Sequence, residues 1–435
     1  MTATDSPTTA ANDSPRTVTD SLDFAACVGI DWADEVHAVC LFAAGSDAAE
    51  HRTLEQTPEA IDAWVAELRQ RFAGRRIAVC VEQSRGALIY ALLKYDCFVI
   101  YPINPKQLAR FREALAPSGS KDDPDDAWLL VQFLLKHRDR LRPSKPDDAD
   151  TRLIGLLVED RRDAIALRTR LTNALAARLK QYFPQALELL GGNLTTRLAG
   201  EFLRRWPTLD ALQRARPQTV RQFFVDHNCR DTEAIDQRLE LIRRAVPLTH
   251  DRAVIDSSVL HVHMLAGQLL ELATAVAEYD RQIAQHFAAH PDHELFDSFP
   301  GAGEVLAPRL LAAFGSDRQR VRDARQIQQY SGIAPITQRS GKSKVVKRRW
   351  ACPRFLLQTF HEFANHSRPF CAWAQAFYEM MRARGAGHHA AVRTLAFKWI
   401  RVLFVCWKTR TPYNDAQYLA SLRRRHSPML AYLKP

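Results

Sequence analysis

The chain has 435 residues and a net charge of +11, and this length favours roughly two to four domains over one. A hydrophobic fraction of 46% supports a real core, and the eight cysteines occur singly, which argues against a disulfide or zinc framework. Residues 1–22 are small and polar and lack the apolar core of a signal peptide, so we expect a disordered lead-in. No later run looks long and apolar enough to cross a bilayer, which argues against a membrane protein.

Charge is distributed unevenly along the chain. Residues 331–435 hold 19 Lys and Arg against three acids, a balance of +16, so residues 1–330 carry −5 by difference from +11. A one-sided basic region is typical of nucleic-acid binding, because each neutralised phosphate releases counterions. A generically basic surface is the simpler alternative.

Residues 23–145 combine apolar strands with amphipathic helices. The segment AACVGIDWADEVHAVCLF predicts a β-hairpin whose first strand ends at Asp31 and whose second strand begins at Val36. Further strands are expected at 76–82 and 97–101, and helices at 57–72, at 87–95 and from Asn104 onward. Strands that alternate with helices indicate an α/β domain with parallel pairing among the later strands.

Residues 151–290 are predicted to be helical. Apolar residues recur at steps of three or four through 151–182 and again through 258–287, where the spacing is that of a coiled coil. The simplest arrangement pairs these two stretches as an antiparallel coiled-coil arm, and a plain helical core explains the pattern nearly as well. In either case we expect no catalytic chemistry there.

Residues 291–435 form the basic, mainly α-helical part of the chain. The segment FDSFPGAGEVLAPRLLAAFG fits the hairpin of a helix-hairpin-helix element, in which Gly301 and Gly303 let backbone N–H groups approach a phosphate. An ordinary tight turn between helices has the same composition. Six basic residues follow within 339–349, and helices with basic exposed positions are expected from there nearly to the end.

Four carboxylates are candidates for one metal site. Asp31 and Glu82 each end a predicted strand, and Asp123 and Asp126, three residues apart, share one face of a predicted helix. Carboxylates brought together repel one another unless cations lie between them, and two Mg²⁺ ions would suit both the oxygen ligands and phosphodiester cleavage. Helix capping is the alternative, because Pro124 suits the first helical position and would make Asp123 the N-cap.

Several segments together resemble one known family. GIDWA with Asp31, VEQS with Glu82, INPKQLARFREA, and Lys121 followed by Asp123 and Asp126 resemble the Asp-Glu-Asp-Asp signature of the DEDD transposases of the insertion-sequence 110 family. The later segments SFPGAG, YSGIAP, QRSGK and GHHAAVRTLAFKWIRVLFVCW resemble the C-terminal transposase domain of that family. The resemblance covers most of the chain, with the segments in the right order.

One position departs from the family pattern. The usual Lys-Thr-Asp is Lys121, Asp122, Asp123 here, so Asp122 and Asp125 form a second pair with the same spacing. The flanking lysine and alanine fix the register, by which Asp123 and Asp126 are assigned to the metal site.

The resemblance implies a RuvC-like domain of the RNase H fold at residues 23–145, which holds Mg²⁺ through the four acids. It also implies that Ser340 is the nucleophile and that Ser340 and the acids come from different protomers, with the helical arm supplying dimerisation. Without the family, a loop serine that contacts DNA passively is the simpler interpretation of Ser340. The basic residues expected to bind nucleic acid are Arg339, Lys342, Lys344, Lys347, Arg348 and Arg349.

The basic region also contains two adjacent histidines and several tryptophans. His388 and His389 are adjacent on a predicted helix and point to different faces, so a solvated or phosphate-contacting role is favoured over metal binding. The tryptophans are expected to be core residues of amphipathic helices rather than base-stacking platforms, and these are Trp350, Trp373, Trp399 and Trp407.

With these patterns, the resemblance implies a DNA recombinase of an insertion sequence, located in the cytoplasm at the nucleoid. It would cleave element and target DNA with Mg²⁺, link transiently to DNA through Ser340 and exchange strands. Its expected partners are double-stranded DNA, a guide RNA encoded by the element, and other copies of the chain in a homodimer or homotetramer. The alternatives are a RuvC-like Holliday-junction resolvase that uses metal-activated water, and a catalytically dead nucleic-acid-binding repressor on the same scaffold.

Overall fold

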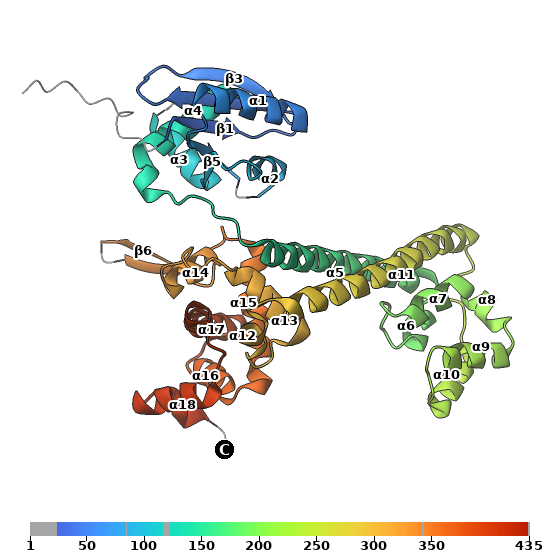
Figure 1. Cartoon of the computed structure of the whole chain (residues 1–435). Coiled ribbons are helices and arrows are strands. Elements are labelled where there is room, and N and C mark those ends of the chain that lie inside the picture. The colour runs from blue at the N-terminus through green and yellow to red at the C-terminus, as the bar shows by residue number, and fades with distance from the viewer. Residues whose placement is uncertain (1–23, 84, 116–121, 342, 434–435) are drawn as a thin grey trace, which may run out of the picture. The chain divides into compact units, whose positions relative to one another are not determined.

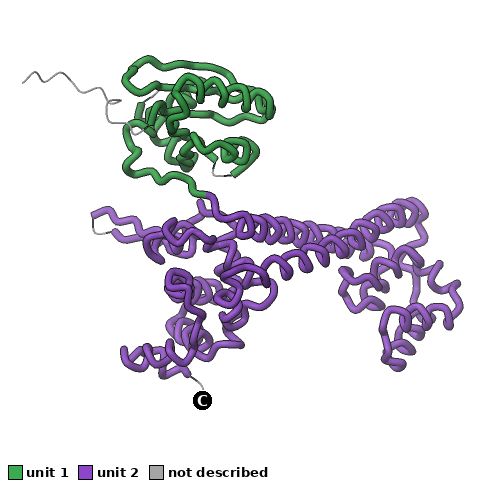
Figure 2. Tube along the Cα trace, in the orientation of Figure 1, with its two compact units in different colours: residues 1–145 green, residues 146–435 purple. Residues whose placement is uncertain are grey.

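The chain forms two compact units, which Figure 2 shows in green and purple. The first unit comprises residues 1–145 and the second comprises residues 146–435. The expected lead-in, together with Lys121 and Lys342, lies outside the residues that the computed structural model describes, which are 24–83, 85–115, 122–341 and 343–433.

A five-stranded sheet forms the centre of the first unit (Figure 1). Its strands are β1 Ala26–Asp31, β2 Val36–Ala43, β3 Glu50–Glu55, β4 Ile77–Val81 and β5 Phe98–Pro102. The order is β3-β2-β1-β4-β5, in which β2 pairs antiparallel with β1 and β3, and β4 pairs parallel with β1 and β5. The predicted hairpin and the parallel pairing of the later strands are therefore confirmed.

Helices cover both faces of this sheet. They are α1 Pro58–Arg71, α2 Ala87–Leu92, α3 Pro105–Leu115 and α4 Asp123–His137. Because side chains alternate along a strand, Val28 and Ile30 of β1 pack in one apolar cluster with Trp64 of α1. Cys27 of β1 faces the other way and packs with Leu130 of α4.

Two long helices, α5 Ala149–Tyr182 and α11 Arg252–Ala289, lie side by side in the second unit (Figure 1). Arg161 forms an ion pair with Asp280, and the Arg178 guanidinium lies 3.2 Å from His261 Nδ1. From the first of these contacts to the second, the residue number rises along α5 and falls along α11. The two helices therefore run antiparallel.

Helix α11 is long and apolar enough by composition alone to cross a membrane, with a mean hydropathy of 1.4 over its most apolar window. The expectation that no run has these properties was therefore wrong. Along this helix Val262, Leu265 and Leu269 are buried and belong to one apolar cluster with Leu175 and Leu179 of α5. Packing against α5 thus accounts for these buried positions of the helix.

Five short helices between α5 and α11 pack at one end of this pair (Figure 1). They are α6 Gln185–Leu189, α7 Arg197–Arg205, α8 Leu209–Gln213, α9 Pro217–Asp226 and α10 Thr232–Arg244. Their core is aromatic, and the ring centroids of Phe202 and Trp206 lie 5.4 Å apart.

The remaining helices gather at the other end of the pair and are predominantly apolar inside. They are α12 His293–Asp297, α13 Gly303–Phe314, α14 Ala324–Tyr330, α15 Arg354–His366, α16 Ala372–Ala383, α17 His388–Thr409 and α18 Asp415–Arg424. Trp399 of α17 lies at the centre of this core, with its indole N–H donating to Ser367 Oγ at 2.8 Å. The predicted, mainly helical C-terminal region is confirmed.

A small antiparallel hairpin interrupts these helices. Its strands are β6 Ile336–Ser340 and β7 Ser343–Lys347, and every described residue in them except Ile336 is exposed. The hairpin was not expected, because its basic sequence lacks the alternation of buried and exposed positions that marks a strand packed on a core.

Candidate active site

Asp31 and Glu82 lie at the carboxyl ends of neighbouring parallel strands. Ile30 of β1 pairs with Val81 of β4, so the next residue on each strand is one of the two acids. Cys27 and Cys80 point to the sheet face that α4 covers, and alternation places Asp31 and Glu82 on that same face. The structure thus brings these two predicted site residues together.

A buried histidine supports the turn that follows Asp31. His37 is fully buried in β2, and its Nδ1 accepts a hydrogen bond from the Ala33 backbone N–H at 3.1 Å. Its Nε2 therefore carries the proton and donates to Gln56 Oε1 at 2.6 Å. Burial lowers the pKa of His37, which keeps the ring neutral and this pair of bonds intact.

Helix α4 rests directly on β1 beside these acids. A Cβ atom at Gly29 would collide with the Ala127 carbonyl oxygen and would lie 2.8 Å from Val131 Cγ2. Only glycine permits so close an approach of helix and strand. The contact fixes the first turn of α4, which carries Asp123 and Asp126, on the sheet face that holds Asp31.

The two acids of α4 have different environments. Asp123 is exposed, whereas Asp126 is only 2% exposed and accepts hydrogen bonds from Arg112 of α3, with its Nε at 2.8 Å. The expected cap is displaced by one residue: Asp122 is the N-cap, Asp123 begins the helix, and the Asp122 side chain makes no capping bond. Capping by Asp123 is therefore wrong as an explanation of the acid cluster.

The donor set fits a divalent cation in its chemistry. All four candidate ligands offer carboxylate oxygens, which Mg²⁺ prefers, and three elements bring them to one face of one sheet. As they stand, the described side chains form no group of three or more His, Cys, Asp or Glu that could hold a metal ion. The engagement of Asp126 with Arg112 is one reason, because a cationic side chain already neutralises that carboxylate.

Ser340 is in the second unit, exposed at the end of β6. It pairs with Ser343 across the hairpin, and Gly341 in the connecting turn has a φ of +55°, which suits a tight two-residue turn. The preceding pair sets Arg339 directly opposite Lys344. Like charges in opposite positions repel, so this end of the hairpin favours an anion between them.

The expected phosphate-binding turn at Pro300 has a packing role of its own. Gly301 has a φ of +75°, and a Cβ atom there would lie 2.8 Å from the His366 carbonyl oxygen. Gly303, with a φ of +50°, has no atom within 4 Å of such a Cβ atom. Contact with the helix end at His366 explains the need for glycine at 301, and phosphate binding at Gly301 and Gly303 stays a prediction.

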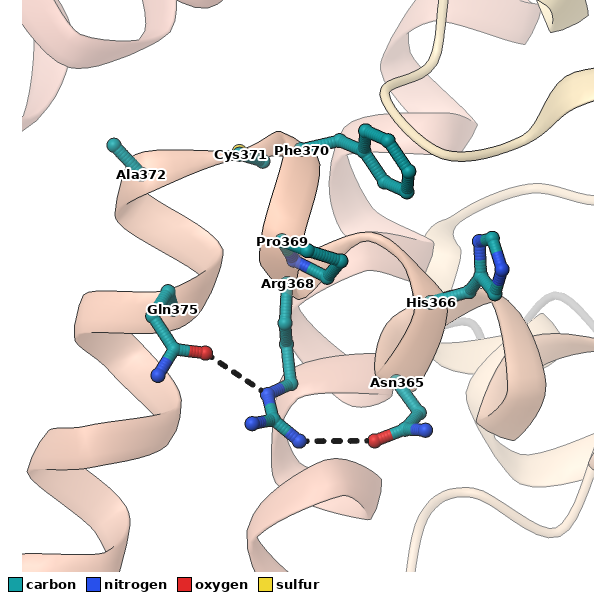
Figure 3. A pocket seen from close by; sticks show the side chains of 8 residues that line it. All are labelled: Asn365, His366, Arg368, Pro369, Phe370, Cys371, Ala372 and Gln375. Carbon is teal, nitrogen blue, oxygen red and sulfur yellow. Dashed lines mark hydrogen bonds between the residues drawn. The ribbon is translucent and has the colours of Figure 1, made fainter. Parts of the chain in front are cut away.

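A hollow opens beside this turn (Figure 3). Arg368 lies at its centre, where its guanidinium donates to Gln375 Oε1 and Asn365 Oδ1 and stacks 3.6 Å from the Tyr378 ring centroid. Phe370, 62% exposed, stacks on His366. Arg368 is satisfied by these neighbours, so the hollow offers no free cation for chemistry within the part of the chain that the structure describes.

The tryptophans divide into two groups. Trp373, Trp399 and Trp407 are fully buried in α16 and α17, as predicted. Trp350 is 79% exposed and lies in the segment between β7 and α15, where no helix covers it. Its assignment to a helical core was wrong, because the segment KRRWACP is too basic and too short to bury it.

The two adjacent histidines begin α17. His388 Nδ1 lies 2.9 Å from the Tyr378 hydroxyl, and the ring of His389 lies 5.6 Å from the ring of His361 on α15. Both residues are exposed. Sequence reasoning did not find the neighbouring His361, and it also missed His37 and Arg112, because only the fold brings these side chains to the predicted sites.

Similarity to known proteins extends over most of the chain. Residues 28–184 match a family model described as a transposase, and residues 293–379 match one described as the transposase IS116/IS110/IS902 family. The IS117 mini-circle protein of Streptomyces coelicolor is 30% identical over 405 residues, which cover 91% of this chain and 96% of that protein.

Two further relatives come from other insertion elements. The IS900 protein of Mycobacterium paratuberculosis is 27% identical over 70% of this chain and 75% of its own length. The IS116 protein of Streptomyces clavuligerus is 25% identical over 78% of this chain and 84% of its own length. The chain therefore belongs to the IS116/IS110/IS902 family of insertion-sequence transposases.

Proposed function

We propose that this transposase is a serine-linked DNA recombinase whose active site combines the acids of the first unit with Ser340 of the second. The observation that carries the proposal is that Asp31 and Glu82 lie together at the carboxyl ends of β1 and β4. They lie on the sheet face that α4, which carries Asp123 and Asp126, covers. The order of the sheet, with one parallel and one antiparallel half, supports a RuvC-like unit of the RNase H fold.

Ser340 acts as the nucleophile in this proposal. Its Oγ loses a proton and bonds to phosphorus of a DNA phosphodiester, while the P–O bond to one nucleoside breaks and that nucleoside oxygen takes up a proton. The number of phosphodiester-type bonds is conserved, so a hydroxyl end of the exchanged strand reverses the step and releases Ser340. Arg339 and Lys344, paired across the hairpin next to Ser340, bind the phosphate oxygens and stabilise the developing charge.

The four carboxylates would hold the divalent cations of the reaction. Bound Mg²⁺ supplies Lewis-acid activation of the attacking oxygen and stabilisation of the leaving oxygen. In this chain Glu82 and Asp31 provide ligands from rigid strands, whereas Asp126 must exchange its bond with Arg112 for a bond to the cation. Asp122 and Asp125 are exposed neighbours of the site.

Partners follow from the charge distribution and the family. The basic region binds double-stranded element and target DNA and has surface for a guide RNA encoded by the element. Because the acids and Ser340 are in different units, a homodimer or homotetramer in which each site combines residues of two protomers satisfies the chemistry. The paired helices α5 and α11 supply the dimer contact in this proposal.

Covalent capture tests the proposed mechanism. Purified protein is incubated with element-junction DNA, target DNA and RNA from the flanking noncoding region, with and without Mg²⁺, and protein–DNA adducts are separated by denaturing electrophoresis. We expect an adduct that requires Mg²⁺, Glu82 and Ser340, with Ser340→Ala and Glu82→Gln both negative. Tyr432→Ala, an exposed position in the second unit, is the matched control and should form the adduct normally.

Other results would point to the alternatives. Cleavage that persists in Ser340→Ala without an adduct would indicate the resolvase mechanism with metal-activated water. DNA binding without cleavage in the native chain would indicate the repressor.

A further inference from the structure

The large aromatic side chain of Trp350 is mostly exposed. It is 79% exposed, and the guanidinium of Arg348 lies 4.5 Å from its ring centroid. Val345 and Val346 on the neighbouring strand are also 44% and 57% exposed. Exposed apolar groups beside cations are typical of surfaces on which nucleobases stack.

Arg348 also lies near a second arginine. The pKa of Arg393 on α17 is lowered by burial and by the positive charge of Arg348. The pKa of His361 is lowered by burial and then by His389 and Arg393. Arg348 and Arg393 therefore lie close enough to repel each other, the rings of His361 and His389 lie 5.6 Å apart, and the sequence has no acid between Asp323 and Glu362.

Two further observations indicate that an anion belongs in this group. The Nε atoms of Arg349 and Arg393 are buried, and neither has a hydrogen-bond partner among the described residues. Helix α17 is 22 residues long and begins without a side-chain cap, so its first N–H groups and its dipole also favour an anion. Arg393, near the start of α17, thus combines an unsatisfied buried donor with a like-charged neighbour.

We propose that the base of the hairpin and the start of α17 form a nucleotide-binding subsite, in which Trp350 stacks on an unpaired base and Arg393, with Arg348 and Arg349, binds an adjacent phosphate. The occupant is the DNA strand that Ser340 attacks, because the same hairpin carries Ser340 at its other end. This assignment of the strand rests on the proposed function.

The length of the hairpin gives the position of the unpaired base. Five residues of an antiparallel strand span about 13 Å, at about 3.4 Å per residue. Trp350 lies three residues beyond the end of β7. The stacked base therefore lies more than one nucleotide from the attacked phosphate, and the duplex must be opened at that base.

The test uses the full chain with Ser340→Ala, so that binding is measured without cleavage and a failure of the covalent mechanism does not affect it. Fluorescence anisotropy compares a DNA duplex that contains a bubble of unpaired thymines with the same duplex fully paired. Trp350→Ala, Trp350→Phe and Arg393→Gln are measured against two exposed controls elsewhere in the second unit, Tyr432→Ala and Arg252→Gln.

We expect Trp350→Ala to weaken binding to the bubble by about tenfold and to leave duplex binding unchanged, because stacking needs an unpaired base. Trp350→Phe should keep most of the preference. Arg393→Gln should reduce the salt dependence of binding by about one phosphate contact for both DNAs, and neither control should change either quantity.

Three outcomes would overturn the proposal. Equal binding of the bubble by the native side chain and Trp350→Ala would show that Trp350 does not stack on a base. Equal losses for bubble and duplex would show a general structural effect, which circular dichroism of the variant would check. A preference that appears only with an RNA oligonucleotide of the bubble sequence would assign the subsite to RNA.

Discussion

Arg112 directly contacts one of the four candidate metal ligands. It neutralises Asp126 from a different helix, as a cation would. Asp126 is the candidate ligand that is nearly fully buried, and a buried carboxylate requires a positive partner. Arg112 therefore stabilises the fold without a metal ion and would compete with such an ion for this candidate ligand.

Removing this arginine should increase the affinity for divalent cations. We expect Arg112→Gln to bind Mn²⁺ about thirtyfold more tightly, since the cation no longer displaces a charge-assisted hydrogen bond of about 2 kcal/mol. Electron paramagnetic resonance of free Mn²⁺ measures this directly, without DNA. The same variant should unfold at lower temperature without metal and regain stability when Mg²⁺ is added.

Arg110→Gln is the matched control, because Arg110 is exposed on the same helix. Its Mn²⁺ affinity should equal that of the native chain. If Arg112→Gln also leaves the affinity unchanged, Asp126 is not a ligand, and the metal site must be built from the other acids.

At the scale of elements, the contact of α4 with β1 determines where two of the four acids lie. Gly29→Ala should destabilise the first unit by about 3 kcal/mol, since the added methyl group meets the Ala127 backbone rather than a flexible side chain. Differential scanning calorimetry should show a lower transition temperature for the first unit and a diminished Mn²⁺ affinity in the remaining folded protein.

Gly267→Ala provides the contrast. Gly267 lies within α11, and a Cβ atom there would have no neighbour within 4 Å. Alanine should stabilise this helix by up to about 1 kcal/mol, because it favours helical conformations over glycine. If Gly29→Ala leaves the transition temperature of the first unit unchanged, α4 can shift on β1 without loss of stability.

Elements with a buried face were predictable from the sequence, and exposed ones were not. The periodicity at 57–72 corresponds to α1, whose Trp64 and Leu68 are buried, and the short apolar runs ended close to Asp31 and Glu82. Strand β3, with the polar sequence EHRTLE, has one buried residue and forms an edge. The strands β6 and β7 are also exposed, so no hydrophobic pattern marked them.

The positions of the candidate residues in the fold were predictable, but their contacts were not. Spacing and strand ends indicated Asp31, Glu82 and Asp126, because these depend on local structure. The partnership of Asp126 with Arg112, the support of the Asp31 turn by His37, and the exposure of Trp350 depend on tertiary packing. A single sequence does not contain these relationships in any periodic form.

At the scale of the whole molecule, the proposed site requires two protomers, and a mixing experiment tests this. Ser340→Ala and Glu82→Gln are each inactive alone in the proposal. If Ser340 of one protomer serves the acids of its partner, a 1:1 mixture should recover about one quarter of the native adduct, since half of random dimers are mixed and one of their two sites is intact.

The mixture should stay inactive if each site uses one chain only. Leu260 and Met264 on α11 are 74% and 51% exposed and lie four residues apart, so they mark one apolar stripe along the paired helices. Replacing both with Glu should abolish recovery if this stripe joins the protomers, and light scattering should then show a monomer. Recovery that survives would place the dimer contact elsewhere.

The exposed hairpin also affects the tendency of the protein to aggregate. Each of its strands pairs with the other alone among the described strands, so each has an outer edge whose backbone groups could join a strand of another copy. Lysine and arginine on such edges oppose that pairing by repulsion, and β6 and β7 carry Arg339, Lys344 and Lys347. Phosphates that neutralise these charges also remove the repulsion, and aggregation should therefore be greatest near charge balance between protein and nucleic acid.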